Sequence, residues 1–570
     1  MEQSFSLDAP LDGRPSRLRA LLRASAPTLS EWALSAASAA LLVLSFPDFN
    51  LWPLAWVGLV PLMLAVARRP RGAQAFLLGW ATASLFFYCS CYWLTHAMIH
   101  YGDIPRWLAY ILLIPAPLVT GLFPALWSFA LARVCRRRGL GLALVFAPFA
   151  WAALEWARLG ITGQLWNALG YSQAYVPALI QPARWGGVYA VGFLLVAVNA
   201  AIAYLLARRS VRALMKASLC VVAVALVFFL SNWEGKSSEP LETNAKAGVV
   251  VVGVQPNVSA NFGRSSEQTA LLVNQHLSMS ESALREWEDG EARSSVENVE
   301  VTRPTPAAAR VVIWPESPMN FTYARDAQFR ATVARFAREQ RALVLFNSLE
   351  PAPAGGSYNS AVLVDSEGRL VAQYDKIRLL PFGEYVPLPR WLPAAWLLSG
   401  IVGDFTPGDK YPLMPLNGAT RMREGGAGGK EEVRAGVFIC FESAFPSIAR
   451  TFAKEGADVL INISNDGYLG RTPVMRQHLA NVVLRAVETG RPILRVTNTG
   501  ISARITARGE VLDATEGFEP AVRTWPVGRS DGRKTFYTSY GDIFNALCAA
   551  LSLLFIWTTF RPNRKAGAGA

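Results

Sequence analysis

Charged residues are scarce in this sequence. Asp, Glu, Lys and Arg make up 17% of the 570 residues, whereas hydrophobic residues make up 52%. This balance is wrong for a soluble enzyme and indicates a chain that is partly solvated by lipid. The length also exceeds the usual size of one domain. We therefore expect a membrane region and at least one further domain.

The sequence also lacks a basic face for nucleic acid, although its formal net charge is +13. Its Lys and Arg residues gather in short loops between apolar runs and are not interleaved with aromatic residues on a globular unit. These basic clusters lie in residues 14–23, 68–71, 133–138, 208–212 and 561–565. We expect no nucleic-acid partner.

Eight apolar runs approach the roughly 20 residues that a helix needs to cross the hydrocarbon layer. They cover residues 31–47, 52–67, 73–95, 107–132, 141–158, 186–207, 213–231 and 543–560. With the N-terminus in the cytoplasm, the positive-inside rule places all the basic clusters on that side. The first two runs are short and could form one re-entrant hairpin or two spans. The first could also pass for a signal peptide, but we expect an uncleaved helix and eight spans.

This topology predicts five consecutive parts of the chain. They are a cytoplasmic N-terminal segment (1–30), a membrane bundle of about seven helices (31–231), an exported domain (232–542), a closing transmembrane helix (543–560) and a cytoplasmic tail (561–570). The exported segment would hold any chemistry that needs water-soluble groups.

Short runs rich in Val and Ile alternate with helix-like segments in the exported part. The expected strands lie in residues 247–257, 309–317, 342–348, 359–365, 434–443, 457–466 and 492–498. The expected helices cover residues 265–287, 326–340, 444–455 and 473–489. Strands with helical connections predict an α/β sandwich.

Three loops interrupt this pattern. Residues 288–309 are polar and 423–433 are glycine-rich and charged, so both are expected at the surface. Residues 386–403 are instead apolar and carry Trp391 and Trp396. We expect this loop to reach the membrane interface, where it would admit substrates; the alternative is a loop that covers the core.

Cysteine is rare outside the membrane runs. Of the six cysteines, only Cys440 lies in the exported domain, so it has no partner there for a disulfide. A free cysteine is commonly a small buried hydrophobe. Other ionisable residues, however, also follow β-runs: Glu316 in "WPES", Lys376 eight positions before Glu384, and Glu442 two positions after Cys440.

These residue types suit nucleophilic catalysis. A thiol has a pKa of about 8.5 and must become a thiolate to attack an acyl carbon. A carboxylate in a pocket of low dielectric can take its proton, and a lysine ammonium can stabilise the oxyanion that follows. The alternative for a single Glu or Lys is a solvated surface charge.

Three motifs occur in order: "VVIWPES", "YDKIRLLPFGEYVP" and "GVFICFESAFP". They resemble the Glu–Lys–Cys signature of the nitrilase (carbon–nitrogen hydrolase) superfamily over roughly residues 249–525. "SNDGYLG" and "RAVETGRPILRVTNTGIS" continue the match. The flanking apolar runs, with "TFYTSYGD" at residues 535–542, narrow the resemblance to the apolipoprotein N-acyltransferase family. It implies a multi-span helical membrane bundle with an exported nitrilase-like αββα sandwich.

The resemblance assigns roles to the aligned residues. It implies that Glu316 is the general base, that Lys376 helps to hold the oxyanion and that Cys440 is the nucleophile. The backbone N–H of Phe441 would be a second oxyanion donor. Phe441 itself stands where the family often has Tyr, so any hydroxyl role at this position is missing.

Other matching residues would support the site. Glu384 and Glu442 match family carboxylates that position Lys376 or the incoming amine. Tyr468 stands where the family usually has Trp. Asn359 and His478 fit the family pattern too, although a turn amide and a packed imidazole are the alternatives.

The implied reaction is a two-step acyl transfer. The nucleophile takes a fatty acyl chain from a phospholipid as a thioester and passes it to the N-terminal amine of a diacylated apolipoprotein. The expected location is the bacterial inner membrane, with the domain in the periplasm and the chain a monomer. Two alternatives are a membrane-tethered amidase or nitrilase and a non-enzymatic binding or transport protein. The second is disfavoured because the membrane runs show few buried charges beyond Glu155, whereas a transport path usually needs several.

No cofactor is expected, because the sequence has no glycine-rich phosphate loop. His96 and His100 are four residues apart, a spacing that can bind metal on a helix, but a third good ligand is absent. We therefore expect interfacial histidines and no metal.

Overall fold

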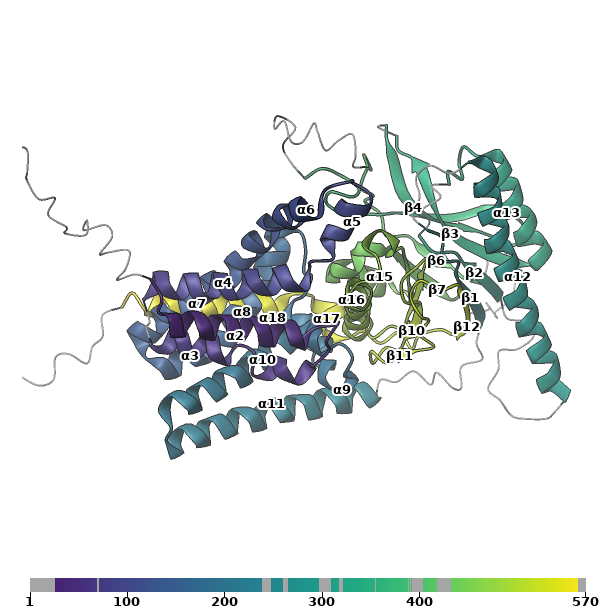
Figure 1. Cartoon of the computed structure of the whole chain (residues 1–570). Coiled ribbons are helices and arrows are strands. Elements are labelled where there is room, and N and C mark those ends of the chain that lie inside the picture. The colour runs from purple at the N-terminus through teal and green to yellow at the C-terminus, as the bar shows by residue number, and fades with distance from the viewer. Residues whose placement is uncertain are drawn as a thin grey trace, which may run out of the picture.

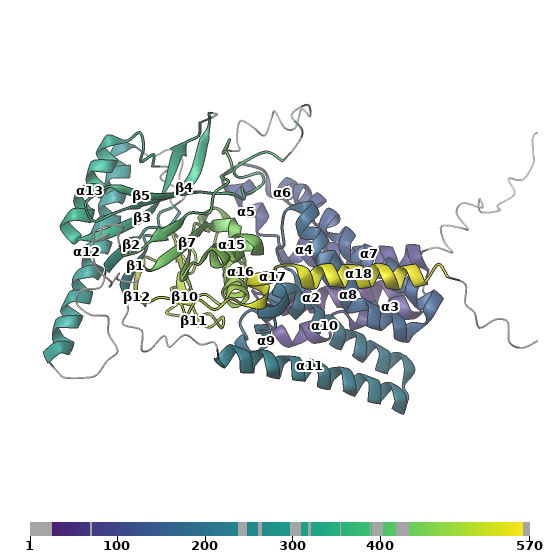
Figure 2. The same ribbon diagram turned by 180° about the vertical axis from the view of Figure 1, so that it is seen from behind.

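A computed structural model describes most of the chain in two parts (Figure 1). The described residues are 26–68, 71–237, 248–259, 265–296, 309–316, 321–353, 355–387, 389, 391, 403–417 and 432–561. One part is a bundle of long helices and the other is an α/β domain beside one end of the bundle (Figures 1 and 2).

Each of the eight predicted apolar runs contains a helix. The long helices are α2 (Leu29–Ser45), α3 (Val60–Arg68), α4 (Gly72–Ser90), α7 (Pro115–Arg138), α8 (Leu140–Thr162), α10 (Ala183–Arg208), α11 (Val211–Ser237) and α18 (Ile543–Thr558). The shorter ones are η1 (Trp52–Trp56), α5 (Leu94–His100), α6 (Arg106–Leu113), η2 (Leu169–Gln173) and α9 (Pro177–Ile180). The last helix, α18, runs back along the bundle although it follows the α/β domain in sequence (Figure 1).

Among the described residues, four helical stretches are long and apolar enough to cross a membrane. A fifth is the pair α4 and α5, which bends by 50° between its two helices. The regions Leu29–Ser45, Trp52–Arg68 and Ile543–Thr558 are apolar but shorter. Four or five spans are thus supported by length and composition, and the count of eight stays a prediction.

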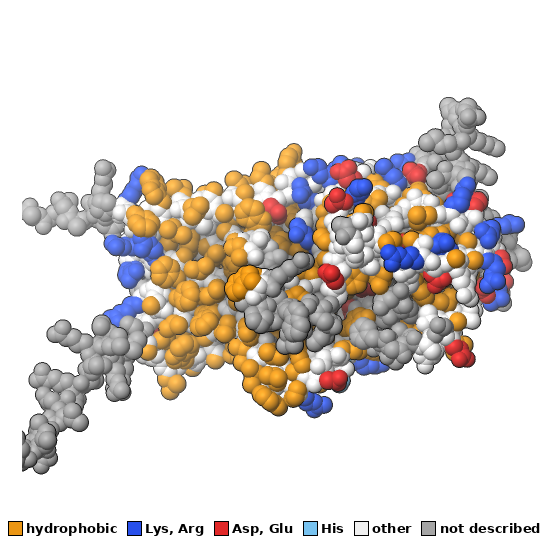
Figure 3. Space-filling view, turned by 90° about the horizontal axis from the view of Figure 1, so that it is seen from above, with side chains coloured by type: hydrophobic (Ala, Val, Ile, Leu, Met, Phe, Trp, Pro, Cys, Tyr) orange, Lys and Arg blue, Asp and Glu red, His pale blue; other side chains and the backbone are white. Residues whose placement is uncertain are grey.

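The surface of the bundle fits a lipid environment. Its side is covered largely by hydrophobic side chains, and Lys and Arg side chains gather at the end far from the α/β domain (Figure 3). Leu219, Leu553 and Trp557 are among its large exposed hydrophobic residues. In water such a surface would drive aggregation, whereas lipid chains cover it at no cost.

The α/β domain contains two six-stranded sheets. The first has the order β12-β1-β2-β3-β4-β5 and the second β11-β10-β9-β8-β7-β6. The strands of the first are β1 (Val249–Gln255), β2 (Ala309–Ile313), β3 (Ala342–Pro351), β4 (Ser357–Val364), β5 (Leu370–Asp375) and β12 (Ala521–Val527). Those of the second are β6 (Leu413–Pro415), β7 (Arg434–Ile439), β8 (Val459–Ser464), β9 (Ile493–Thr497), β10 (Ala503–Ile505) and β11 (Val511–Leu512).

Helices cover the outer faces of the two sheets. They are α12 (Ser266–Val296) and α13 (Ala327–Gln340) on the first sheet, and α15 (Pro446–Glu455) and α16 (Val474–Thr489) on the second (Figures 1 and 2). The alternation of side chains along β1 explains this arrangement. Val249 and Val251 belong to the core between the sheets, whereas Val252 and Val254 pack with residues of α13. The domain is thus the expected αββα sandwich.

The strand directions explain where a site can form. Strands β1, β2 and β3 are parallel, as are β7, β8 and β9. The antiparallel hairpin through β4 turns β5 back to the direction of β3. The carboxyl ends of β2, β5, β7 and β8 therefore lie at one edge of the sandwich, where loops are free to hold polar side chains.

Some predicted boundaries were wrong. The helix expected over 265–287 continues to Val296, so part of the predicted polar loop 288–309 is helical. Five strands were not predicted, because β6, β10 and β11 are only two or three residues long and β5 and β12 mix polar with apolar residues. The glycine-rich segment 423–431 lies outside the described residues.

Candidate active site

Cys440 lies at a sharp turn directly after β7. It begins the short helix η3 (Cys440–Ala444), and its φ of 50° lies in the left-handed region that a residue with a Cβ rarely adopts. Such strain persists only where the surrounding structure imposes it, and it often accompanies a functional role. The turn presents the side chain at the edge where the parallel strands end.

Lys376 is the central cation of this edge. It follows β5, is only 1% exposed, and its Nζ donates a hydrogen bond of 2.8 Å to Glu384 Oε1. Glu316 Oε1 lies 3.7 Å from the same Nζ. Burial alone would lower the pKa of Lys376, but Glu384, Glu316 and Cys440 raise it above its usual value. The lysine therefore stays an ammonium and carries a positive charge beside the thiol.

The charge of Lys376 does not make Cys440 a thiolate by itself. Burial raises the pKa of the Cys440 thiol, and Glu316 raises it further, while Lys376 acts in the opposite direction. The net result is a pKa above the usual value, so Cys440 rests as a thiol. Chemistry at Cys440 therefore needs a base to accept the proton as the bond forms.

Asn359 joins the two carboxylates. Its Nδ2 donates to Glu316 Oε1 at 2.9 Å and to Glu384 Oε1 at 2.7 Å. Its Oδ1 in turn accepts a hydrogen bond of 2.7 Å from Asn347 Nδ2, which fixes the orientation of the amide. The second oxygen of Glu316 accepts from the backbone N–H of Asn465. Both carboxylates are thus held in place around Lys376.

Glu442 has a different environment. One oxygen accepts from the Tyr374 hydroxyl and from the N–H groups of Ile377 and Arg378, and the other accepts from the N–H of Ile439. Burial raises the pKa of this carboxyl, and the N–H donors oppose the shift. Glu442 therefore ties the turn after Lys376 to the turn before Cys440.

His478 anchors the same turn from α16. Its Nε2 lies 2.9 Å from the carbonyl oxygen of Cys440, and its Nδ1 lies 2.8 Å from Asp466 Oδ1. Arg495 donates to the other oxygen of Asp466 at 2.9 Å. Burial disfavours the charge of Asp466, but His478 and Arg495 hold its pKa below the ordinary value. This chain of bonds fixes the backbone of the strained Cys440.

The helical bundle supplies a wall of the site. Trp166 stacks on Phe441 with ring centroids 6.1 Å apart and an interplanar angle of 18°. Its Nε1 donates to Gln477 Oε1 at 2.9 Å, and Trp93 Nε1 donates to the same oxygen at 3.1 Å. Gln477 in turn donates to the carbonyl of Pro47. Three separate segments of the bundle therefore meet α16 within one residue of His478.

Two buried charges hold the segment that carries Trp166. Arg158 donates to the carbonyl of Trp166 at 2.9 Å, and Glu155 Oε1 accepts from the N–H of Leu169 at 2.8 Å. Both belong to α8. This structural role accounts for the charged pair inside an apolar bundle, so no transport path is needed to explain it.

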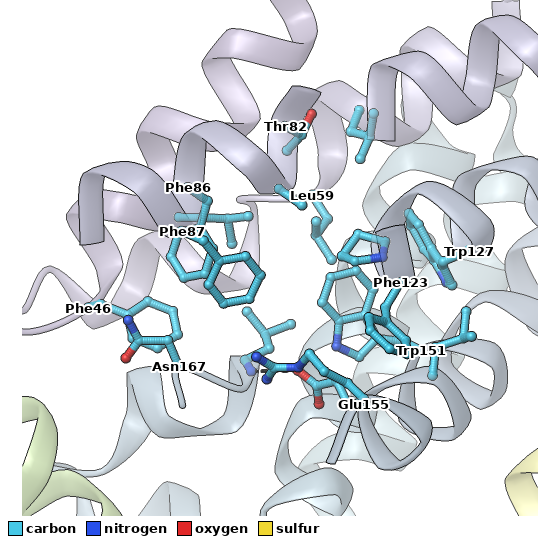
Figure 4. Close-up of a pocket in the computed structure, with 17 residues that line it drawn as sticks. Phe46, Leu59, Thr82, Phe86, Phe87, Phe123, Trp127, Trp151, Glu155 and Asn167 are labelled. Carbon is cyan, nitrogen blue, oxygen red and sulfur yellow. Dashed lines mark hydrogen bonds between the residues drawn. The ribbon is translucent and has the colours of Figure 1, made fainter. Parts of the chain in front are cut away.

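A small cavity of about 40 Å³ lies in the bundle next to this pair (Figure 4). Apolar side chains, including Phe86, Phe87 and Phe123, line most of it, and Glu155 and Asn167 are among its few polar residues (Figure 4). Asn167 Nδ2 lies 3.5 Å from Gln477 Oε1. The apolar space therefore borders the residues that connect the bundle to the site.

Helix α5 and the residue that follows it touch the loop after β8. Tyr101 packs on Tyr468 with ring centroids 5.6 Å apart, and His96 lies directly against Gly470. Tyr468 thus keeps an aromatic contact at the position where the family usually has Trp. No group of three or more His, Cys, Asp or Glu side chains in the described part of the chain is placed to hold a metal ion.

The structure brings together Glu316, Lys376, Glu384, Cys440 and Glu442, and their catalytic roles stay a prediction. Trp391 of the predicted loop 386–403 is 79% exposed, and Trp396 lies outside the described residues. The sequence reasoning missed the contributions of Asp466 and Trp166. Asp466 was inside a quoted motif, and the "LWN" sequence at 165–167, an aromatic and an amide between two spans, was an available signal.

Comparisons with known proteins cover both parts of the chain. The family model of the apolipoprotein N-acyltransferase N-terminal domain matches residues 38–201, and that of the carbon-nitrogen hydrolases matches residues 254–534. An apolipoprotein N-acyltransferase from Geobacter metallireducens is 30% identical over 93% of this chain and 95% of its own length. One from Sinorhizobium medicae is 28% identical over 83% and 85%.

Among solved structures, the chain resembles an amidase from Nesterenkonia sp., with 16% sequence identity. The alignment covers 53% of this chain and 97% of the amidase, with a TM-score of 0.32.

Proposed function

Since this chain belongs to the apolipoprotein N-acyltransferase family, and so N-acylates apolipoproteins, we propose that Cys440 carries the acyl group between its two substrates. The donor is a phospholipid and the acceptor is the N-terminal amine of a diacylated apolipoprotein. The observation that carries the proposal is the strained turn of Cys440 beside buried Lys376 and Glu316. A packed core thiol would need neither the strain nor the charges.

In the first half-reaction, Glu316 accepts the proton of the Cys440 thiol while sulfur attacks the ester carbonyl of the phospholipid. Negative charge develops on the carbonyl oxygen, and Lys376 Nζ with the N–H of Phe441 stabilises it. The intermediate collapses to a thioester. The lysophospholipid leaves as an alcohol after it takes the proton back from Glu316.

In the second half-reaction, the amine of the acceptor attacks the thioester. Glu316 takes a proton from the amine, an amide bond forms, and the Cys440 sulfur leaves and is reprotonated. Asn359, Glu384 and Glu442 touch no reacting atom in this scheme. They position Lys376 and the Cys440 turn, which supports a site whose geometry is set before the substrate binds.

The bundle supports a lipid substrate rather than a small soluble amide. Trp166 closes the site against Phe441, and Asn167, the next residue, lines the apolar cavity of the bundle. Such a wall keeps water from the thioester. We place the bundle (31–231) and the closing helix (543–560) in the bacterial inner membrane, with the domain (232–542) on the periplasmic side. The remaining parts, 1–30 and 561–570, lie in the cytoplasm, and the chain acts as a monomer.

Intact-mass measurement tests this proposal. The purified protein is incubated with phospholipid and without acceptor, so that the acyl-enzyme accumulates. We expect one fatty-acyl adduct that is absent from Cys440→Ala and present in Cys89→Ala, which removes an exposed thiol of the bundle. An adduct that persists in Cys440→Ala would refute the assignment of the nucleophile. Ammonia release from simple amides without any adduct would favour an amidase.

A further inference from the structure

A second polar pocket lies between the bundle and the α/β domain. Its volume is about 280 Å³, and its lining comes from the first turn of α10, the end of α11, the residue after α16 and the segment before α17 (Phe536–Tyr540). The lining residues are Arg184, Glu234, Gly490, Asp531, Arg533 and Lys534. Three cations and two carboxylates leave this pocket with a net charge of +1.

Arg184 is the unusual member of this pocket. It is only 6% exposed, and its Nε has no hydrogen-bond partner among the described residues. An unsatisfied donor on a buried arginine is costly, so a bound acceptor is the simplest explanation for its retention.

The carboxylates around Arg184 are already engaged. Glu234 Oε2 accepts a hydrogen bond of 2.7 Å from Trp185 Nε1, and Asp531 lies 3.5 Å from Arg533 Nε. Lys534 donates one of its three N–H groups to the carbonyl of Lys454. Arg184 Nε and the remaining N–H groups of Lys534 therefore retain the capacity to bind an anion.

The pocket lies at the level where two candidate spans end. The span over Ala183–Arg208 begins one residue before Arg184, and the span over Val211–Glu234 ends at a lining residue. Next to it, Trp233 is 67% exposed on α11, as is usual for tryptophan at the boundary between lipid and water. Helix α11 runs along the edge of the bundle, beside α10 (Figures 1 and 2). A lipid can therefore reach the pocket from the side.

We propose that this pocket binds the phosphate of a membrane phospholipid. Arg184, Arg533 and Lys534 hold the phosphate oxygens, and the acyl chains lie along the exposed side of α11. The planar guanidinium of an arginine suits paired hydrogen bonds to phosphate, and basic pockets between spans recognise lipid headgroups. The bound lipid links α11 to the α/β domain.

This site is separate from the reaction centre. His478, which contacts Cys440, and Gly490, which lines the pocket, are twelve positions apart along α16. At a rise of 1.5 Å per residue they lie about 18 Å apart. The proposal therefore does not depend on the chemistry of Cys440.

A headgroup cross-linking experiment tests the proposal. The full chain is placed in nanodiscs that contain a phospholipid with a photoreactive headgroup, and the cross-linked peptides are mapped by mass spectrometry. We expect cross-links to residues 229–234 and 531–534. They should fall at least tenfold in Arg184→Gln/Lys534→Gln. Arg335→Gln, an exposed cation of α13, should keep them.

Four outcomes decide the proposal. Equal cross-linking in the wild type and the double variant overturns it. Equal capture of a diacylglycerol with the same photoreactive group also overturns it, since that lipid has no phosphate. Loss of the cross-links with millimolar inorganic phosphate shows that the ligand is a soluble phosphate instead. Loss only in the double variant, while the acyl adduct at Cys440 still forms, supports the lipid site and shows that the protein is folded.

Discussion

The two sides of the site around Cys440 are built in different ways. The sandwich side is charged, and Lys376, Glu316 and Glu384 lie within one hydrogen-bonded cluster. The bundle side presents aromatic rings, with Trp166 and Trp93 sharing the amide of Gln477. This difference fits our proposal that the sandwich performs the chemistry, whereas the bundle shapes the space in which a lipid substrate lies.

The largest predicted effect comes from removing the cation on the charged side of the site. Lys376→Met removes the cation but keeps a similar shape, so the developing oxyanion loses its charged partner. We expect acyl-adduct formation to slow by about 10²–10³-fold. The buried Glu384 would also lose its counter-ion, at a cost of roughly 3–5 kcal/mol in folding stability.

The measurement is the rate of adduct formation by intact mass, together with the melting temperature. Lys410→Met, which removes an exposed lysine, is the matched control and should behave as the wild type. Adduct formation at the full rate in Lys376→Met would contradict the role assigned to this lysine.

A smaller effect tests the aromatic side. Trp166→Ala removes the ring that stacks on Phe441 and the donor to Gln477. A loosened wall misplaces the substrate, so we expect the adduct to form about 10–10²-fold more slowly. Trp166→Phe retains a ring and should lose less than Trp166→Ala.

Mass spectrometry measures the rate of adduct formation. With acceptor present, it also compares the rate of the second half-reaction with the rate of thioester hydrolysis. If the loss of the Trp166 ring admits water, the ratio of free fatty acid to acylated acceptor should rise. If both Trp166 variants slow the reaction equally and no free acid appears, the bundle serves only for stability.

The smallest effect concerns a third contact between the two regions. Glu488 on α16 accepts a hydrogen bond from the N–H of Val188 on α10 and forms an ion pair with Arg485. Burial raises its pKa from 4.5 to about 7, although Arg485 opposes the shift. The folded protein therefore binds a proton here that the unfolded chain releases, and stability should fall as the pH rises from about 4.5 to 7.

The expected slope from one such proton is at most about 1.4 kcal/mol per pH unit. Melting temperatures of the detergent-solubilised protein between pH 4.5 and 7 measure it. Glu488→Gln should flatten this part of the curve, whereas Glu367→Gln, at an exposed carboxylate, should leave it unchanged. A slope that is the same in Glu488→Gln would rule out this carboxyl as its source.

The sequence predicted much of this arrangement. All seven predicted strands and all four predicted helices of the α/β domain occur, because Val- and Ile-rich runs and amphipathic periodicity are local signals. Glu316, Lys376 and Cys440 were predicted as one site because each follows a strand within a specific motif, and the structure places them together. The short strands β10 and β11 were missed, since their pairing depends on neighbours and not on their own composition.

What the sequence alone determined is the set of reactive groups and the division into apolar and α/β parts, because both depend on residue type and local order. The tertiary structure decided how these groups act. The stacking of Trp166 on Phe441, the shared amide of Asn359 and the left-handed backbone of Cys440 arise from segments far apart in the chain. Packing within the sandwich fixes the Asn359 amide and the Cys440 turn, and packing of the bundle against the sandwich fixes the Trp166 stack, since no local pattern encodes which distant side chains will meet.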